Sequence, residues 1–226
     1  MSSLRRIPFL APLDDERLAA LEQQCSWKRY GENELIIDFG DQDDDVYFVV
    51  DGRARVLYRA ATGKEFIFAD VTSGQFFGDI AAIDGQPRSA NVTTLQPSQL
   101  GIMPGGVFRQ IVLNTPDLSR GLLEILAARV RALNTRLAEH TFLNASQRLY
   151  AELIRLSRPR ADGSSTRIIS PPPFEHELAA RIGTRRESVS RELALLARDG
   201  LVEKTRGGLV LTDPRELNRR IAAGSG

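Results

Sequence analysis

One short segment holds side chains of the kinds that bind a phosphate group. It runs from Phe77 to Ala90 and contains a glycine, a carboxylate, a short apolar stretch, an arginine and a serine. Arg88 offers a forked pair of donors to phosphate oxygens, and Ser89 adds a hydroxyl and a backbone amide. The apolar stretch after Gly78 predicts a short helix whose N-terminus would attract an anion. Asp79 could accept a hydrogen bond from a ribose hydroxyl while pairing with Arg88, although an arginine–aspartate pair in a loop is more often structural.

A second segment, residues 175–196, has the pattern of a helix, a tight turn and another helix. Apolar residues recur at helical spacing on both sides of Gly183, which can adopt the left-handed backbone of such a turn. Thr184, with Glu187 three residues later, predicts a capping box at the start of the second helix. Arginine can donate two hydrogen bonds to guanine and a carboxylate can accept one from cytosine, so the outward face suits a DNA major groove. That face carries Arg185, Arg186, Glu187, Ser190 and Arg191.

The same side chains would also suit a charged surface helix that contacts only solvent. The choice between this interpretation and DNA binding therefore depends on neighbouring features of the sequence. Residues 1–143 contain 15 basic and 19 acidic residues, whereas residues 144–226 contain 15 basic and 10 acidic ones. The second segment therefore lies in the half that would meet a polyanion. After it, two short apolar runs around Gly207-Gly208 predict a β-hairpin wing, whose Lys204 and Arg206 could contact phosphate. Together these features favour DNA binding.

Short strands are the elements expected to position the first segment. Between residues 28 and 105, alternating apolar runs are separated by glycine-containing turns, which is typical of a β-barrel or sandwich. Phe48, Phe66 and Phe68 are expected to fill its interior, and a short helix is expected over residues 14–25. The predicted strands are Glu34–Ile37, Val46–Val50, Ala54–Tyr58, Glu65–Phe68, Asn91–Thr94 and Gln99–Ile102.

A long helix is predicted over residues 117–142. Its apolar residues are spaced three and four apart, which is typical of a coiled coil and favours a partner helix from a second copy, although packing on its own barrel would give a similar stripe. Asn144 and Gln147 then predict a capped start for a new helix that extends to about Ser157. The apolar positions are Leu123, Leu126, Val130, Leu133 and Leu137.

The predicted fold class is therefore α+β. We expect a jelly-roll β-barrel of the kind that binds cyclic nucleotides over residues 1–116. A dimerisation helix and hinge follow over residues 117–143, and a winged helix-turn-helix over residues 144–226.

Composition argues against several other classes of protein. The single cysteine, Cys25, cannot form an internal disulfide or hold an iron–sulfur cluster or a structural zinc. No apolar run approaches the ~20 residues that span a bilayer, so a cytoplasmic location without a membrane partner is expected. The only histidines are His140 and His176, and a haem ligand in the barrel is not expected. We find no nucleophile–base pair, metal-ligand cluster or Walker-type loop, so we expect neither an enzyme nor a metal site.

Over roughly residues 10–215, the chain resembles the cyclic AMP receptor protein (Crp/Fnr) family of transcription regulators. The resemblance is carried by the glycine-punctuated barrel, the segment 78–90, the long helix, the Phe142-Leu143-Asn144 hinge and the pattern Arg186-Glu187-x-x-x-Arg191. It implies a homodimer on double-stranded DNA, with cyclic AMP or cyclic GMP as the allosteric ligand and a TGTGA-like inverted repeat as the site. The family also implies contact with RNA polymerase through the loop around residues 157–164. The implied ligand-binding residues are Gly78, Asp79, Ile80, Arg88, Ser89 and Asn134, and the implied DNA-binding residues are Arg185, Arg186, Glu187, Ser190 and Arg191.

Two departures from the family pattern bear on the ligand. Asp79 stands where glutamate is usual, so the contact to the ribose would need a shifted sugar or a water molecule. Leu133 and Asn134 stand where cyclic-AMP-specific members have threonine and serine, which predicts weaker discrimination between adenine and guanine. An effector-independent regulator, or one that senses a cyclic dinucleotide, therefore remains an alternative, as does a nucleotide-gated module that regulates an enzyme.

Overall fold

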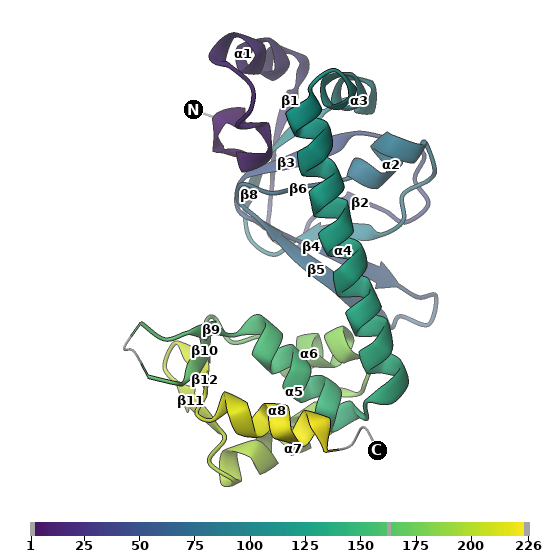
Figure 1. The fold of residues 1–226 in the computed structure, drawn as a ribbon. Coiled ribbons are helices and arrows are strands. Elements are labelled where there is room, and N and C mark those ends of the chain that lie inside the picture. Colours follow the sequence, from purple (N-terminus) through teal and green to yellow (C-terminus); the bar gives the residue numbers. More distant parts are fainter. Residues whose placement is uncertain (1–2, 162–163, 224–226) are drawn as a thin grey trace. The chain divides into compact units, whose positions relative to one another are not determined.

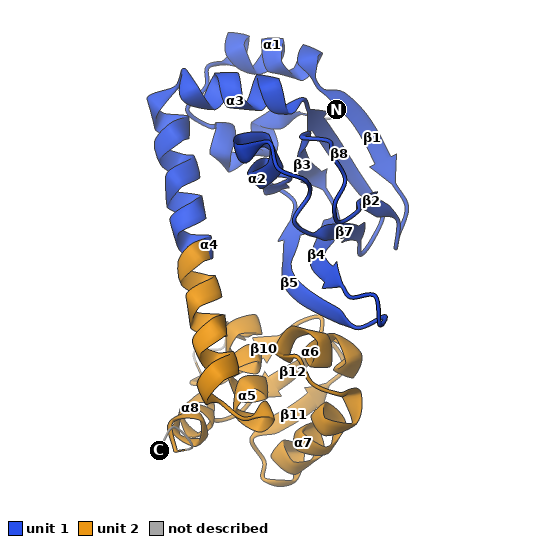
Figure 2. Ribbon diagram, turned by 90° about the vertical axis from the view of Figure 1, so that its right-hand side faces the viewer, with its two compact units in different colours: residues 1–129 blue, residues 130–226 orange. Residues whose placement is uncertain are grey.

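The chain folds into two units that share one long helix. The computed structural model describes residues 3–161 and 164–223, and their contacts divide the chain into unit 1 (residues 1–129) and unit 2 (residues 130–226), coloured separately in Figure 2. The shared helix is α4 (Pro116–Phe142), which continues without a break through the boundary (Figure 1). The two units divide this helix between them, whereas the sequence-based domain limits treat it as a separate segment.

Two four-stranded antiparallel sheets form the barrel of unit 1. Their strand orders are β1-β8-β3-β6 and β2-β7-β4-β5. The β3–β4 hairpin turns at Gly52 with a φ of +107°, and a Cβ there would collide with the Ser98 hydroxyl, so only glycine fits. The strands are β1 (Ser26–Tyr30), β2 (Leu35–Ile37), β3 (Val46–Asp51), β4 (Arg53–Arg59), β5 (Glu65–Thr72), β6 (Phe76–Phe77), β7 (Asn91–Thr94) and β8 (Ser98–Met103).

The six predicted strands are present, but one predicted set of core residues is partly wrong. Phe48 is fully buried, whereas Phe66 and Phe68 are only half-buried and Ile67 between them is buried. Because successive residues of a strand point to opposite faces, burial of Ile67 places the two phenylalanines on the other face of β5. Strand β1 was not predicted, since it is mostly polar and Tyr30 alone in it is buried.

Helices pack against the apolar core of the barrel. Helix α1 (Asp15–Gln24) begins at Asp14, whose side chain accepts a hydrogen bond from the Arg17 amide, as the predicted helix over residues 14–25 requires. Helix α2 (Asp79–Asp84) follows β6, and α3 (Gly105–Leu113) follows β8. Leu118 and Leu122, at the start of α4, are buried in the same core as Phe48 and Phe108.

The α4 residues of the predicted coiled-coil seam behave differently. Leu123, Val130, Leu133 and Leu137 are all exposed in the single chain, and Leu126 is half-buried. The barrel therefore takes up Leu118 and Leu122, while most of the 3.5-residue stripe remains open to a partner.

Unit 2 is built on short helices and a four-stranded sheet of order β11-β12-β10-β9. The predicted capping box is confirmed: the Gln147 amide donates to Asn144 Oδ1 and the Asn144 amide donates to Gln147 Oε1, both at 3.0 Å. The helices are α5 (Ala145–Leu156), α6 (Glu175–Ile182), α7 (Arg186–Arg198) and α8 (Pro214–Ala222), and the strands are β9 (Arg158–Pro159), β10 (Arg167–Ile169), β11 (Val202–Thr205) and β12 (Gly208–Leu211). The predicted fold class, an N-terminal barrel, a long helix and a C-terminal winged helix-turn-helix, is confirmed.

Candidate effector site and nucleic-acid interface

The turn between β6 and α2 brings the backbone close to Arg88. Gly78 has a φ of +88°, and a Cβ at this position would lie 2.6 Å from the carbonyl oxygen of Asp45 and 2.9 Å from a guanidinium nitrogen of Arg88. No side chain fits there, so glycine allows both the left-handed backbone and the close approach. Gly78 thereby lets the Arg88 side chain lie against the start of α2.

Arg88 is a buried, fully engaged cation. Its side chain is 2% exposed, and it donates to the carbonyl oxygens of Gly78 (3.1 Å) and Asp45 (2.8 Å). Its Nε and one terminal nitrogen also donate to the two carboxylate oxygens of Asp43. The guanidinium carbon lies 5.7 Å from the centre of the Tyr47 ring, which is stacked on Phe77. These contacts fix the guanidinium in one orientation, which is what recognition of an anion by a forked donor needs.

Asp79 pairs with a different arginine from the one expected. Its buried carboxylate accepts a hydrogen bond of 2.7 Å from Arg129 on α4, and no bond to Arg88 is present. The predicted Asp79–Arg88 pair is therefore wrong, because Asp79 opens α2 and meets α4 while Arg88 extends to the loop of residues 41–45. The Arg129 guanidinium also lies 5.9 Å from the Phe76 ring centre.

The remaining residues predicted for the ligand site are more open. Gly78, Asp79 and Arg88 come together, whereas the side chains of Ile80 and Ser89 are exposed. Asn134 is exposed on the part of α4 that belongs to unit 2.

The loop around Arg88 is strongly acidic. It carries Asp43, Asp44 and Asp45 in succession, and Asp44 binds Arg109 at 2.8 Å. Burial raises the pKa of Asp45 above its ordinary value, and the neighbouring Asp43 charge raises it further. Burial also raises the pKa of Tyr47 to about 12, with Asp43 adding to the shift. An anion that approaches Arg88 therefore passes the acidic side chains of Asp43, Asp44 and Asp45 before it reaches the buried guanidinium.

Sequence reasoning missed two residues of this site, Asp43 and Arg129. Asp43 lies in an acidic run without any periodic pattern, and its partner is 45 positions away in the chain. Arg129 stands out in the sequence only as a charged position beside the apolar stripe of the long helix, and its partner is 50 positions away. Neither distance leaves a local signal.

The predicted helix-turn-helix is present in unit 2. Helix α6 ends at Ile182 and is capped by Gly183, whose φ is +63°, and α7 begins three residues later, at Arg186. The predicted Thr184 cap of α7 is wrong. The cap position is Arg185, with an extended backbone and no side-chain cap bond, so the helix starts one residue further on. The predicted inward residues Val189, Leu193 and Leu196 are buried.

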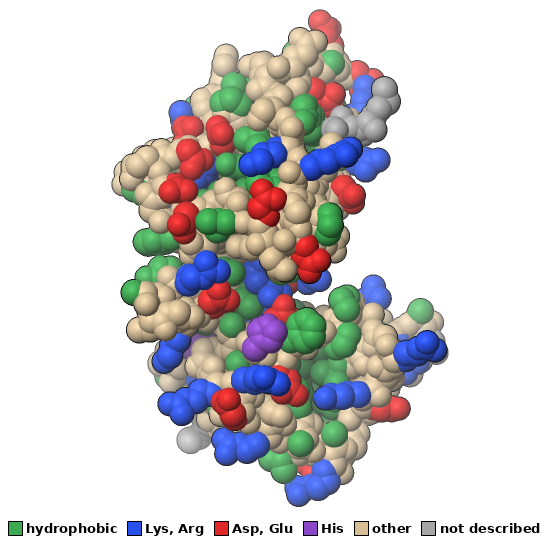
Figure 3. Space-filling model, turned by 180° about the vertical axis from the view of Figure 1, so that it is seen from behind, with side chains coloured by type: hydrophobic (Ala, Val, Ile, Leu, Met, Phe, Trp, Pro, Cys, Tyr) green, Lys and Arg blue, Asp and Glu red, His purple; other side chains and the backbone are tan. Residues whose placement is uncertain are grey.

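The outward face of α7 is open to solvent, and we call this helix the recognition helix. Near its start Arg186 makes a loose ion pair, 3.8 Å between its Nε and Glu175. Figure 3 shows both acidic and basic side chains spread over the side of the protein drawn there. The wing forms as β11 and β12, with Lys204 and Arg206 exposed. The predicted contact residues, all exposed, are Arg185, Arg186, Glu187, Ser190 and Arg191.

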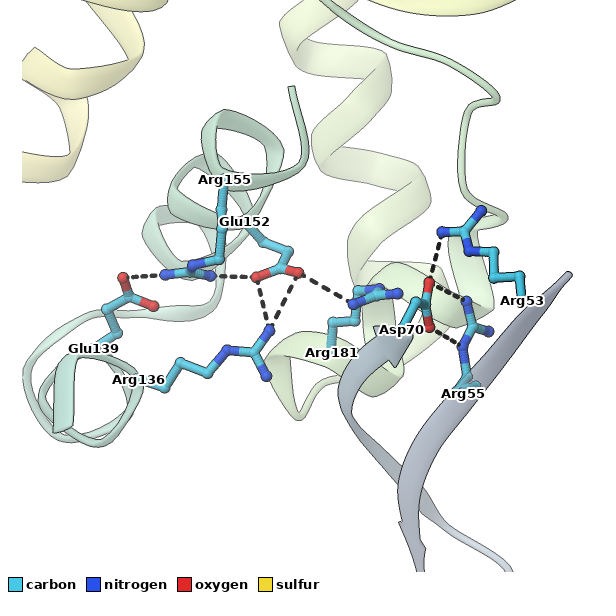
Figure 4. Close-up of polar contacts among 8 residues, drawn as sticks. All are labelled: Arg53, Arg55, Asp70, Arg136, Glu139, Glu152, Arg155 and Arg181. Atoms are coloured by element: carbon cyan, nitrogen blue, oxygen red, sulfur yellow. Dashed lines mark hydrogen bonds and ion pairs between the residues drawn. The ribbon is translucent and has the colours of Figure 1, made fainter. Parts of the chain in front are cut away.

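A cluster of ion pairs joins the end of α4 to the helix-turn-helix within unit 2 (Figure 4). The Glu152 carboxylate, 1% exposed, lies 3.4 Å from Arg136 on α4 and 3.7 Å from Arg181 on α6. Arg155 contacts Glu152 and also binds Glu139 at 2.5 Å. This set of five residues, the Glu152 cluster, ties α4, α5 and α6 together.

Two further contacts cross the same junction. Arg148 donates to the carbonyl oxygens of Leu143 (2.8 Å) and Ile182 (3.0 Å). The His140 ring lies so close to Gly183 that a Cβ there would be 3.0 Å from its Cε1. The predicted hinge at residues 142–144 is therefore bridged by hydrogen bonds and packing.

The described residues contain no cluster of three or more potential metal ligands. They also contain no helix that is both long and apolar enough to cross a bilayer.

Comparison with known proteins agrees with this architecture. Residues 27–115 match the family model "Cyclic nucleotide-binding domain", and residues 121–220 match "Crp-like helix-turn-helix domain". A protein of Mycobacterium tuberculosis described as a CRP-like cAMP-activated global transcriptional regulator is 25% identical over 219 residues, which cover 96% of this chain and 97% of the relative.

Two solved structures share the fold at lower identity. A CooA mutant from Carboxydothermus hydrogenoformans has a TM-score of 0.80 with 19% identity and 98% coverage of both chains. The c-di-GMP responsive global regulator CLP of Xanthomonas campestris has a TM-score of 0.72 with 21% identity, covering 88% of this chain and 100% of CLP. With a barrel of the first domain type, a helix-turn-helix of the second and relatives that regulate transcription, the chain belongs to the Crp/Fnr family of DNA-binding transcription regulators, which are not enzymes.

Proposed function

We propose that this protein is a cytoplasmic homodimer that binds an inverted-repeat, TGTGA-like DNA site when cyclic AMP or cyclic GMP occupies its barrel. The observation that carries the proposal is the buried guanidinium of Arg88, held against Gly78 inside a domain of the cyclic nucleotide-binding type. A cyclic phosphate carries the negative charge and the paired oxygens that such a fork binds. Asp79, already paired with Arg129, keeps a second carboxylate oxygen for a ribose hydroxyl.

The proposed dimer forms through the exposed stripe of α4. Leu123, Val130, Leu133 and Leu137 supply the apolar seam. In the DNA-binding state the two recognition helices would lie about 34 Å apart, one turn of DNA, so that both enter successive major grooves. The effector shifts the population toward that state only by binding it more tightly.

Leu133 and Asn134 support a relaxed choice of purine. Leucine cannot bond to an exocyclic amine, while the Asn134 amide can donate to or accept from either base. We expect the affinities for cyclic AMP and cyclic GMP to differ by less than about a hundredfold, that is, by less than about 2.7 kcal/mol.

A second candidate is a regulator that answers a cyclic dinucleotide or no ligand at all. Two observations favour it: Asp43 already neutralises Arg88, and the fold is similar to that of a c-di-GMP responsive regulator. As a further partner we propose RNA polymerase, contacted through the loop around residues 157–164, of which residues 162 and 163 lie outside the described part of the chain.

Calorimetry with cyclic AMP and cyclic GMP, followed by fluorescence anisotropy on a palindromic TGTGA-containing duplex, tests the ligand. Arg88→Leu should abolish nucleotide binding, whereas Arg109→Leu, which loses a neighbouring arginine paired with Asp44, should leave it within a few-fold. DNA binding that ignores both nucleotides would retain the DNA-binding assignment but contradict the effector site. Equal loss in both variants would contradict the role of Arg88.

The same anisotropy assay tests the recognition helix. Arg186→Ala should weaken binding to the specific duplex by about 1–3 kcal/mol and relax the preference at one base pair. Arg198→Ala, at the far end of the same helix and equally exposed, serves as the control. An unchanged base preference in Arg186→Ala would contradict direct readout by this side chain.

A further inference from the structure

The contact between Asp43 and Arg88 has the geometry of an anion complex. Both carboxylate oxygens of Asp43 accept hydrogen bonds from the guanidinium, one from Nε at 3.2 Å and one from a terminal nitrogen. A phosphate group would use the same pair of donors, because two adjacent oxygens match the guanidinium fork. One fork cannot hold both anions in this way.

The two partners differ in how easily they can move. The side chain of Arg88 is 2% exposed and that of Asp43 is 43% exposed. Of the acceptors described around Arg88, those of Gly78 and Asp45 are main-chain carbonyls, whereas the carboxylate of Asp43 can leave by side-chain rotation into solvent. Backbone hydrogen bonds of 2.9 Å, from Gly40 to Arg88 and from Arg88 to Asp41, hold the loop beside the cation. Asp43 therefore lies over Arg88 but is not itself enclosed.

We propose that Asp43 is a specificity-determining residue that occupies the phosphate position on Arg88 until an effector displaces it. The inference rests on the proposed function, since it concerns the same site. A buried guanidinium needs a negative partner, so a neutral ligand gains nothing by removing Asp43. A ligand with a phosphate replaces one anion by another and frees Asp43 for solvent. The aspartate thus restricts the site to anionic ligands and lowers their affinity.

The test compares Asp43→Asn with Asp44→Asn. Each change removes one negative charge from the same loop, and the two side chains are similarly exposed, 43% and 39%. Only Asp43 contacts Arg88, whereas Asp44 contacts Arg109. Calorimetry with cyclic AMP, cyclic GMP and cyclic di-GMP measures the affinity of each protein, adenosine serves as the neutral probe, and urea unfolding checks that both variants are folded.

We expect Asp43→Asn to bind at least one of these nucleotides about tenfold more tightly than the wild type does, because one charge-assisted hydrogen-bond pair no longer competes. Asp44→Asn should change the affinity less than about threefold, and adenosine should gain nothing in either variant. If Asp43→Asn binds a nucleotide and the wild type does not, the competition between Asp43 and the phosphate is also supported, because Asp43 then blocks the site completely.

Three results would overturn the inference. If the wild type binds a nucleotide and Asp43→Asn shows no gain, or the same gain as Asp44→Asn, the competition is wrong while the proposed function stands. A gain for adenosine equal to that for the nucleotides would show that displacement needs no phosphate. If no variant binds any of the three nucleotides, the proposed function and the competition fail together.

Discussion

The Glu152 cluster gives the sharpest prediction about stability. Glu152→Gln keeps the shape of the side chain but removes its charge at a site that is 1% exposed. Three guanidinium groups, those of Arg136, Arg155 and Arg181, would then lose the charge of the carboxylate that they share, while Arg155 keeps its bond to Glu139. We expect unit 2 to lose stability while unit 1 is unaffected.

The size of the loss follows from burial. Removing one partner of a buried ion pair costs about 3–5 kcal/mol, because the remaining charges stay desolvated. Arg155 is 34% exposed and retains Glu139, which reduces the cost, whereas Arg181 is 5% exposed and Arg136 13%. A loss of about 3 kcal/mol is therefore expected. With a urea m-value of about 1.5 kcal/mol per molar, the unfolding midpoint of unit 2 should fall by about 2 M.

The chain contains its own reporter for the assay. Its single tryptophan, Trp27, lies on β1 in unit 1, so fluorescence follows that unit while far-ultraviolet circular dichroism follows the helices of both. In Glu152→Gln, the loss of the helical circular-dichroism signal should begin at a urea concentration about 2 M lower than in the wild type. The transition that Trp27 reports should stay at the same urea concentration. Glu203→Gln, an exposed glutamate on the wing, is the control. An unchanged helical midpoint, or an equal shift of the Trp27 transition, would refute this reasoning.

Three further predictions use the same unfolding assay at fixed protein concentration. Arg129→Gln should shift the Trp27 transition by about 2 kcal/mol, because it leaves buried Asp79 without its counter-charge; no shift would mean that the pair is dispensable. Gly183→Ala should cost unit 2 about 1–2 kcal/mol for the left-handed backbone, with the His140 contact adding to it, and a neutral result would contradict that geometry. Burial, with help from nearby arginines, lowers the pKa of His140, so the unfolded chain binds this proton more readily. The free energy of unfolding of unit 2 should therefore have its full value above about pH 6.5 and decline as the pH falls below it. His140→Gln should make this decline shallower.

Local patterns in the sequence predicted the elements well. The short apolar runs of β3, β4 and β8 and the Asn144–Gln147 box gave the expected strands and helix start, because these signals lie within a few residues of each other. The ends of helices were predicted less accurately than their presence, as the N-cap of α7 shows: Thr184 was predicted and Arg185 is observed. The strands β6, β9 and β10 have only two or three residues, too few for a pattern to show.

Local sequence patterns could not predict which carboxylate pairs with which arginine in the candidate site. Gly78 and Arg88 were recognisable because they share one segment, but the choice of partner for Arg88 and Asp79 depended on residues 45 and 50 positions away. Two carboxylates and two arginines can pair in more than one way, and only the folded loop and helix decide between them. The exposed faces of Ile80 and Ser89 likewise depend on how α2 packs.

Because α4 crosses the boundary between the units without a break, the number of residues in this stretch of helix has structural importance. A flexible linker tolerates insertions, because its bond rotations absorb them. A helix fixes rotational phase instead: each residue advances the chain by about 100° and 1.5 Å. One residue added between Arg129 and Arg136 would rotate the residues of α4 that follow it by about 100° about the helix axis, and the Glu152 cluster ties those last turns of α4 to α5 and α6. Seven residues, close to two full turns, would nearly restore the phase, so the number of residues in this stretch carries structural information apart from their identity.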